Sequence, residues 1–307
     1  MTSYFVRRLI WTLPVLLGIT FVIHTVLAIT PGDPVRIMLG ETATADQIRV
    51  ARAEIGLDKP FFERYVHYLG RVVRGDLGRS YRSRRPVIAE LRDALPATAQ
   101  LTLAAMVITI GIGVPAGIAS AVWRGKPIDL ALTSLALIGL SMPVFWIGLL
   151  LIYLLAFRFP IFPIGGMQDG WMSFVLPAVT LALNSVALIS RLTRSTVLDV
   201  LGEDYIRTAR AKGLANHRVL WKHALKAAFI PILTVIGLQF GLLMGGAVLT
   251  ETVFSWPGIG RLMVGAIMTR DLLVVQGAVL VLALTFVAIN TAVDLSYSLF
   301  DPRVKYG

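Results

Sequence analysis

Residues 203–231 read EDYIRTARAKGLANHRVLWKHALKAAFIP, a basic segment of helical character between two long apolar runs. The segment opens on two acidic residues, whereas Arg210 and Lys212 place positive charge farther along the chain. This order of charges suits the dipole of a helix that begins at the acids. Gly213 can adopt the left-handed conformation that ends a helix, so the segment predicts a short helix that stops there.

A second helix is predicted directly after the first. Asn216 is a suitable N-cap residue, and apolar residues follow it at helical spacing and lead into the next apolar run. The apolar positions of this second helix are Val219, Leu220, Ala224 and Leu225. The whole segment therefore predicts a helix-turn-helix that joins two apolar runs.

The composition indicates that those apolar runs lie in a lipid bilayer and not in water. Of the 307 residues, 56% are hydrophobic and only 15% are charged, whereas ordinary soluble domains are about a quarter charged. This is the composition of a protein embedded in a bilayer. The net charge of +11 does not indicate nucleic-acid binding, because the cations lie beside apolar runs and are not interleaved with stacking aromatic residues. The absence of cysteine excludes disulfides, thiolate metal sites and cysteine nucleophiles.

Six apolar runs are long enough to cross a membrane, where about 20 residues suffice. They occupy about residues 9–30, 97–122, 129–157, 173–190, 229–252 and 274–297. The first run is longer than the apolar part of a signal peptide and lacks a clear cleavage site, so we expect an uncleaved span. The sequence predicts an all-α integral membrane protein of six transmembrane helices with both termini on one side.

The distribution of cations predicts the orientation. The segments assigned to the cytoplasmic side carry 14 Lys and Arg residues, and the two short loops opposite carry three. The segment 31–95 holds another 12 beside nine acids, but segments of this length count little in the positive-inside rule. Both termini and residues 203–231 are therefore expected in the cytoplasm.

The long outer segment is predicted to form a compact helical cap. Thr44 and Gln47 have the spacing of a capping box for a helix that Gly56 would stop. Pro60 suits the first turn of a second helix that ends near Gly75, and Pro86 suits a third. An apolar stripe on the second helix comprises Phe61, Tyr65, Tyr68, Leu69 and Val72. The alternative is a helical hairpin that rests on lipid headgroups.

Polar residues within the spans could have either of two roles. Ser141, Asn184 and Gln239 would face a permeation pathway or form hydrogen bonds between helices. His24, toward the outer end of the first span, is expected to pack or to form a hydrogen bond. Glycines such as those at 111, 113 and 117 favour close helix packing. Ionisable residues in the spans are scarce, which argues against proton- or ion-coupled transport.

A second functional segment follows the fifth apolar run. Trp256, Pro257 and Gly258 predict a turn just outside the membrane, and bulky aromatic side chains lie close to Glu251. The segment would close an outer opening or meet a binding protein, and the alternative is an aromatic anchor at the interface. Its candidate residues are Glu251, Phe254, Ser255, Trp256, Pro257 and Gly258.

Several motifs resemble one protein family. DYIRTARAKGL, with HAL and Ile230-Pro231 downstream, resembles the cytoplasmic coupling loop of bacterial ABC-importer permeases of the peptide, nickel and glutathione branch. The resemblance extends to GDLGRS, PVIAEL and LPAT between residues 75 and 98, and to ETVFSWPGIGRL at 251–262. Arg-Thr-Ala at 207–209 stands where the family has Glu-Ala-Ala, and His223 and Lys226 stand where it has Ile and Pro. A contact made through a carboxylate at position 207 is therefore not expected.

The resemblance implies a type I ABC importer permease fold with four parts. These are an N-tail and first span (1–30), the extracytoplasmic cap (31–95), a five-span core (96–300) with its coupling loop (191–228), and a cytoplasmic C-tail (301–307). It also implies a bacterial cytoplasmic-membrane location. The implied partners are a second related permease, two ATPase subunits, a solute-binding protein outside and membrane lipid.

The resemblance also implies which residues couple to the ATPase. The apolar face that enters an ATPase groove would comprise Tyr205, Ile206, Ala209 and Leu214, and the rim contacts would come from Thr208, Arg210 and Lys212. Arg207 and Gly213 complete the set of coupling residues. The chain has no G-x-x-x-x-G-K-[ST] motif, because its one Gly-Lys pair, Gly125-Lys126, is followed by Pro127. We therefore expect no catalytic site, no cofactor and no metal in this chain, with ATP and Mg bound by the partner ATPases.

Three alternatives remain, one for the role of the hairpin and two for the function of the chain. In the first, the basic hairpin lies on anionic lipid and does not dock on an ATPase. An ion-coupled carrier or channel would need charged or polar groups in the membrane. An intramembrane hydrolase would need a pair such as Ser141 and His24.

Overall fold

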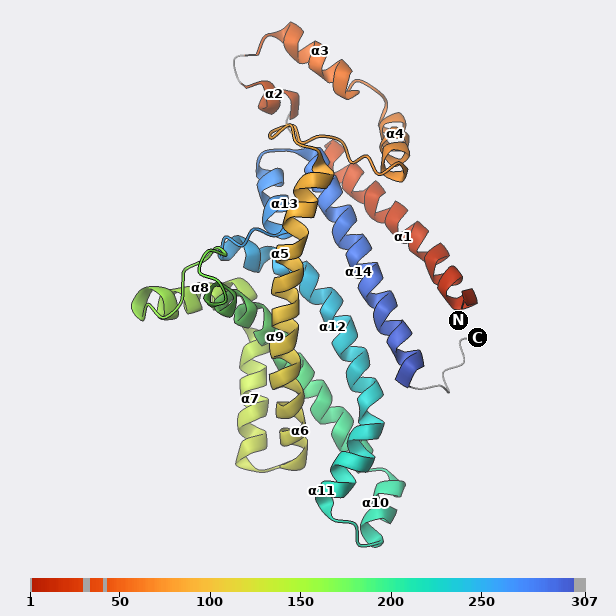
Figure 1. Cartoon of the computed structure of the whole chain (residues 1–307), viewed down its shortest axis with the longest axis vertical. Coiled ribbons are helices and arrows are strands. Elements are labelled where there is room, and N and C mark those ends of the chain that lie inside the picture. Colours follow the sequence, from red (N-terminus) through yellow and green to blue (C-terminus); the bar gives the residue numbers. More distant parts are fainter. Residues whose placement is uncertain (1, 30–33, 41–42, 301–307) are drawn as a thin grey trace. The chain divides into compact units, whose positions relative to one another are not determined.

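The computed structural model describes residues 2–29, 34–40 and 43–300, and within them every regular element is a helix (Figure 1). The expected all-α fold is thus confirmed. The chain divides into two compact units. Unit 1 comprises residues 1–97 and 257–287, and unit 2 comprises residues 98–256 and 288–305. The expected C-tail, 301–307, lies outside the described residues.

Unit 1 holds residues 31–95, the segment that was expected to form the outer cap. Its helices are α1 (Thr2–Ile29), α2 (Pro34–Leu39), α3 (Ala45–Ile55), α4 (Phe61–Val73), the first part of α5 (Val87–Ile108), α13 (Ile259–Met268) and the first part of α14 (Leu272–Phe300). Leu91, Ile259 and Val275 are among the fully or nearly fully buried side chains of its core. A Cβ on Gly277 would lie 2.7 Å from the Val87 side chain, so α14 and α5 approach closely at this glycine.

The local signals in the outer segment are confirmed in α3 and α4. The Thr44 hydroxyl accepts a hydrogen bond from the Gln47 amide, and the Gln47 side chain accepts one from the Thr44 amide, so the capping box forms. Gly56 ends α3 at a φ of +74°. Pro60 is the N-cap of α4 and not a residue of its first turn.

The apolar stripe of α4 packs against α1. Phe21 on α1 makes edge contacts with the rings of Phe61 and Tyr65. The Tyr65 hydroxyl donates to the Leu17 carbonyl oxygen at 2.9 Å. His24 contacts the same rings and lies 3.0 Å from the Gln276 side-chain amide, so the expected hydrogen bond and packing of His24 are found. The amphipathic pattern of α4 is therefore satisfied within this chain.

Unit 2 is organised around one long helix, α9 (Met172–Leu201). The helices beside it are the rest of α5, α6 (Val114–Val122), α7 (Pro127–Ser141), α8 (Val144–Leu151) and α12 (Leu225–Val253). Three segments have π-helical hydrogen bonding: η1 (Thr109–Gly113), η2 (Ile152–Arg158) and η3 (Val219–Ala224). α9 packs against α6, α7, α8 and α12, and many of its side chains are buried. It is the central element of this unit.

The spans differ from the expected runs at two places. Five helical segments are long and apolar enough to cross a membrane, and the third expected run forms two helices, Pro127–Ser141 and Val144–Arg158, bent by 102°. The bend lies at Met142, which is extended because it precedes Pro143. There are six spans only if the bent pair counts as one. The helix after Pro86 is α5 itself, which continues into the second span, so the expected third cap helix and that span are one helix.

A buried ion pair that the sequence did not indicate joins α7 to α9. Arg194 donates from Nε and Nη2 to the two carboxylate oxygens of Asp129, at 2.8 and 2.9 Å. Ser120 and the Gly125 amide donate to the same carboxylate. Asp129 is 6% exposed. These hydrogen bonds converge on one carboxylate and fix the α6–α7 turn against α9.

Close packing of α6 on α9 depends on glycine. A Cβ on Gly117 would lie 2.5 Å from the Ser190 carbonyl oxygen, and one on Gly113 would lie 3.1 Å from the Val186 carbonyl oxygen. Gly111 has nothing within 4 Å of the same position. The expected role of small residues in packing is therefore confirmed at Gly113 and Gly117, while Gly111 faces open space.

We predict that Gly117→Ala destabilises the protein and that Gly111→Ala does not. The added methyl group at 117 meets a backbone oxygen that cannot move alone, and overpacking of this kind costs about 1–3 kcal/mol. At 111 the methyl group meets no atom, and alanine favours helix more than glycine does. Thermal unfolding in detergent measures both variants, and equal melting temperatures would contradict the predicted contact.

Candidate functional site

The basic hairpin is formed by α10 (Asp204–Ala211), α11 (Asn216–Arg218) and η3, and it follows α9 directly at one tip of unit 2 (Figure 1). α10 begins after Glu203, whose extended backbone allows the chain to turn out of α9. Asp204 lies in the first turn of α10 and Arg210 in the last, in the order that suits the helix dipole. The predicted short helix is confirmed.

The end of α10 is fixed by Gly213. This residue has a φ of +77°, and its amide donates to the Arg210 carbonyl oxygen. The next amide, of Leu214, donates to the Ala209 carbonyl oxygen at 3.3 Å. These two bonds form a Schellman motif, and the Leu214 side chain packs against the hairpin core as that motif usually requires. The predicted glycine stop is therefore found one residue after the Lys212 C-cap.

The hairpin has a hydrophobic core of its own. Ile206, Val219 and Ala224 are no more than 1% exposed, and Ala209 is 8% exposed. Partly buried Leu201, Leu214 and Leu220 pack around them. Burying a side chain such as Ile206 contributes about 1.5–3 kcal/mol, so this core stabilises an otherwise marginal helix.

This core changes the expected docking face. Ile206 and Ala209 were expected to enter a partner's groove, but the structure buries both against η3. An amphipathic helix has one apolar face, and here that face is already occupied within the chain. Leu214 is half-buried by the same cluster. Of the four expected apolar contacts, Tyr205 alone keeps an exposed side chain, at 46%.

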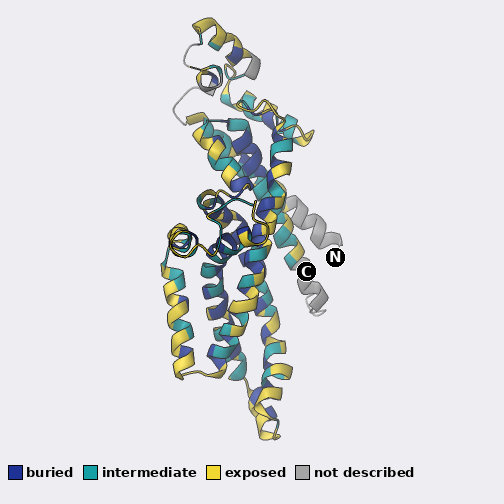
Figure 2. Ribbon diagram, turned by 60° about the vertical axis from the view of Figure 1, so that its left-hand side comes forward, coloured by how far each residue is buried: buried dark blue, intermediate teal, exposed yellow. Residues whose placement is uncertain are grey.

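The exposed face of α10 is polar around Tyr205. Residues 205, 208 and 212 share one side of the helix by their spacing. Thr208, Arg210 and Lys212 are exposed, as the rim role requires, and so are Arg207 and Gly213. Figure 2 shows the tip of the hairpin as largely exposed ribbon. The Thr208 hydroxyl donates to the Asp204 carbonyl oxygen, which leaves its methyl group on the surface.

The second helix of the hairpin begins without the predicted cap. Ala215 occupies the N-cap position and Asn216 is the first helical residue, with no side-chain cap bond. From Asn216 the helix continues through η3 into α12 and ends at Val253, a segment of 38 residues. The prediction of Asn216 as the cap is wrong by one position. The hairpin is thus a direct extension of a span.

The second candidate segment is buried at the other end of that long helix. Glu251 is fully buried, and its Oε1 accepts a hydrogen bond from the Thr98 hydroxyl at 2.6 Å. Phe254 is 1% exposed and Trp256 is 0% exposed. The rings of Trp256 and Phe174 meet edge-on, with centroids 4.7 Å apart. A buried Trp256 is not an aromatic anchor at the lipid interface.

A glycine pair brings a loop over Phe254. The Gly166 amide donates to the Phe254 carbonyl oxygen at 2.8 Å, and a Cβ on Gly165 would lie 2.2 Å from that oxygen. The segment after α8 therefore closes over the end of α12. Ser255 is exposed and has a φ of +53°. In unit 1, exposed Pro257 follows this turn, and buried Gly258 precedes α13 as its N-cap.

The weaker pathway candidates have different surroundings. Gln239 is buried and donates to the Ser185 hydroxyl at 2.7 Å, so it joins α12 to α9. Ser141 is exposed and donates to the Leu137 carbonyl oxygen of its own helix. Asn184 is half-buried on α9. Sequence reasoning missed Thr98, Phe174 and the Gly165-Gly166 pair, because each becomes relevant only through contacts distant in sequence.

Known proteins share this organisation. A family model described as "Binding-protein-dependent transport system inner membrane component" matches residues 113–306. The model of the N-terminal part of such membrane components matches residues 1–102. The chain is 41% identical over 337 residues to the dipeptide transport system permease protein DppB of Escherichia coli (strain K12), covering 100% of this chain and 99% of that protein. It is 40% identical over 306 residues to the glutathione transport system permease protein GsiC of the same strain, covering all of both chains.

Two solved structures share the fold at lower sequence identity. A chain of the inward-facing MetNI methionine ABC transporter aligns with a TM-score of 0.58 and 19% identity, over 70% of this chain and 97% of that chain. A chain of an amino acid ABC transporter solved with histidines aligns with a TM-score of 0.54 and 19% identity, over 71% of this chain and 95% of that chain. These likenesses concern the arrangement of helices.

We predict that Ala209→Asp opens the hairpin and that Thr208→Asp does not. Position 209 lies in the hairpin core, where a carboxylate has no partner, whereas position 208 is exposed one residue away. Trypsin cleavage after Arg207, Arg210 and Lys212 measures the opening, and we expect cleavage of Ala209→Asp to be at least about tenfold faster. Equal resistance of the two variants would contradict burial of this face.

Proposed function

We propose, from the membership of this chain in the family of binding-protein-dependent transport system inner membrane components, that it forms half of a translocation pathway for short peptides or related small solutes. The chain is a membrane permease subunit of an ATP-driven ABC importer. A second, related permease supplies the other half of the pathway. Two cytoplasmic ATPase subunits hydrolyse ATP, and an extracytoplasmic binding protein delivers the solute.

The observation that carries the proposal is the attachment of the hairpin. Only Gly202 and Glu203 separate α10 from α9, and the core side chains of α10 pack against the start of the 38-residue helix that ends at Val253. A force on α10 therefore acts on two spans at once. When the ATPase pair closes, the hairpin moves with it, and the two attached spans move the permease core.

The exposed face of α10 supplies the docking contacts. Tyr205 enters the partner's groove, and Thr208 and Lys212 lie beside it at helical spacing. Arg207 and Arg210 contact acidic residues at the rim. Ile206 and Ala209 hold the hairpin together and do not touch the partner.

At the other end of the same helix, the buried cluster at Glu251 acts as an outer gate. A lone buried carboxylate is costly unless it is hydrogen-bonded, and Thr98 supplies a donor to Glu251. Movement of the helix changes the contacts of Phe254 and Trp256 at the same time. Ser255 and Pro257, both exposed, are the residues here that meet the binding protein.

The cargo class follows from the relatives. The names of two relatives that match over the full length state dipeptide and glutathione transport. Both cargoes are short peptides with a free carboxylate. We therefore assign short peptides to this chain, with the binding protein selecting among them.

We predict that Tyr205→Ala and Thr208→Trp reduce uptake by at least about tenfold in vesicles that contain the complete importer. The first variant removes the groove contact and the second blocks the groove, while both leave the hairpin core intact. His217→Ala, on the exposed surface of α11, is the matched control and keeps normal uptake. Stimulation of ATP hydrolysis by the loaded binding protein is measured in the same vesicles, and the purified chain alone hydrolyses no ATP.

Normal uptake in both α10 variants would overturn the docking role. Uptake that continues without ATP hydrolysis and collapses with an ionophore would instead favour an ion-coupled carrier. Retained uptake in Ser141→Ala removes the intramembrane hydrolase.

We also place the termini and the hairpin in the cytoplasm and α4 outside, at the inner membrane of a bacterium. The chain has no cysteine, so an introduced cysteine is the only thiol of the chain that a maleimide can label. Its labelling therefore shows on which side of the membrane that position lies. We predict that a membrane-impermeant maleimide added to intact cells labels Val73→Cys, which replaces an 87% exposed side chain, and does not label Lys212→Cys. Labelling of the second variant only after permeabilisation supports this orientation, and the reverse pattern overturns it.

A further inference from the structure

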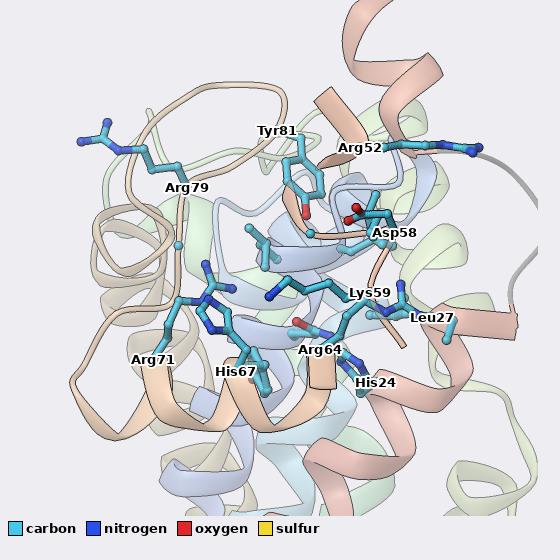
Figure 3. Close-up of a pocket in the computed structure, with 18 of the residues that line it drawn as sticks. His24, Leu27, Arg52, Asp58, Lys59, Arg64, His67, Arg71, Arg79 and Tyr81 are labelled. Carbon is cyan, nitrogen blue, oxygen red and sulfur yellow. Dashed lines mark hydrogen bonds between the residues drawn. The ribbon is translucent and has the colours of Figure 1, made fainter. Parts of the chain in front are cut away.

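A cavity of about 1380 Å³ lies in unit 1, apart from the hairpin and the Glu251 cluster. Its walls come from the C-terminal end of α1, Arg36 of α2, the end of α3 and the segment that follows it, α4, residues 76–84 and the start of α14 (Figure 3). Leu27, Leu272 and Leu273 supply apolar lining where α1 and α14 leave their apolar segments.

The lining is strongly positive. Seven Lys and Arg residues and two histidines line the cavity, against two aspartates, Asp58 and Asp76. The Asp76 carboxylate accepts a hydrogen bond from the Gly78 amide at 2.8 Å. A cationic surface is usually solvated and needs no ligand. Here, however, part of the charge is buried.

Four polar atoms of this lining are buried without a partner. Arg64 Nε, Arg71 Nε, the Tyr68 hydroxyl and His24 Nε2 have no hydrogen-bond partner among the described residues. Tyr68 is only 4% exposed. Buried donors are nearly always hydrogen-bonded in folded proteins, so these atoms call for an acceptor.

The three α4 residues lie on one face of the helix. Residues 64, 68 and 71 follow the spacing i, i+4, i+7, which aligns them along one side. α4 therefore presents two guanidinium groups with a phenol hydroxyl between them. Guanidinium groups bind carboxylate and phosphate oxygens through parallel hydrogen bonds, a geometry that lysine does not reproduce.

The opposite wall adds another donor. Figure 3 shows the Tyr81 hydroxyl directed into the cavity from one side and Lys59, His67 and Arg71 reaching toward it from the other, whereas Arg52 and Arg79 point away. Burial raises the pKa of Tyr81 to about 12, and burial likewise raises the pKa of Tyr68 to about 12. Both hydroxyls therefore keep their protons at neutral pH and can donate.

We propose that this cavity binds an oxyanion, the phosphate or carboxylate of a small anionic molecule, held by Arg64 and Arg71 with Tyr68 and Tyr81 as further donors. The group is carried either by the headgroup of an anionic lipid or by a free solute. The apolar lining accommodates the rest of the molecule. The site is independent of ATPase docking, because none of its residues belongs to the hairpin.

The test uses the purified full-length chain in an uncharged detergent. Thermal unfolding is followed while inorganic phosphate, succinate or short-chain phosphatidylglycerol is added, with short-chain phosphatidylcholine as the neutral lipid. We expect saturable stabilisation by at least one of the anionic probes and none by phosphatidylcholine. Stabilisation by phosphate or succinate identifies a free solute as the source, and stabilisation by phosphatidylglycerol alone identifies a lipid.

Variants assign the effect to the cavity. Arg71→Gln and Tyr68→Phe are expected to weaken binding of the effective probe by roughly tenfold. Arg74→Gln, an exposed residue just after α4 that does not line the cavity, makes the same charge change and leaves binding intact. Tyr68→Phe removes only a hydroxyl group, so it keeps the test valid should Arg71→Gln fail to fold.

Two results would overturn the proposal. One is the absence of stabilisation by all three anionic probes in the unaltered chain. The other is equal weakening by Arg71→Gln and Arg74→Gln together with no effect of Tyr68→Phe, which would indicate general attraction to a positive surface.

Discussion

The burial of Ile206 against Val219 and Ala224 is the contact on which the functional account depends. α10 has only eight residues, and a helix of that length is not stable alone in water. The hydrophobic core and the Schellman motif at Gly213 supply what the isolated helix lacks. Because the contact partners belong to the beginning of the long helix that includes α12, the hairpin and that helix form one body. In the proposed docking role, a partner bound to α10 would act on the membrane helices without an intervening flexible loop.

Packing and polar contacts connect the hairpin to the other end of unit 2. α9 ends two residues before the hairpin and is held by close packing at Gly117 and by the Asp129–Arg194 ion pair. α12 is joined to α9 by the hydrogen bond between Gln239 and Ser185. At the far end of α12, Glu251 and Phe254 are enclosed by Thr98 and the Gly165-Gly166 loop. One helix thus carries the basic hairpin at one end and the buried cluster at the other.

Local signals in the sequence predicted local structure well. Gly213, the Thr44 and Gln47 capping box and the stripe on α4 each act over a few residues, and each was found where the sequence placed it. The prediction of the docking face on α10 was only partly correct. The spacing of Ile206 and Ala209 correctly predicts an apolar face on α10, but a pattern does not show whether that face packs within the chain or against a partner.

The remaining features depend on contacts between distant residues. No pattern in the sequence indicates the pairing of Asp129 with Arg194, which are 65 residues apart. Nor does any pattern indicate the burial of Trp256 or the cationic cavity, whose walls come from six separate segments. Pro143 lies inside a long apolar run, and such a run does not show whether a proline interrupts a helix, as it does here, or is accommodated in it.

Cysteine crosslinking in the assembled importer tests the central claim most directly. The chain contains no cysteine, so Thr208→Cys and Ala209→Cys can be compared as neighbours that differ in burial. We predict that a short crosslinker with one maleimide and one photoreactive group joins the first variant to the ATPase subunit and leaves the second unlinked. Linkage of Ala209→Cys with none from Thr208→Cys would contradict the account, because the buried face would then be the face that docks.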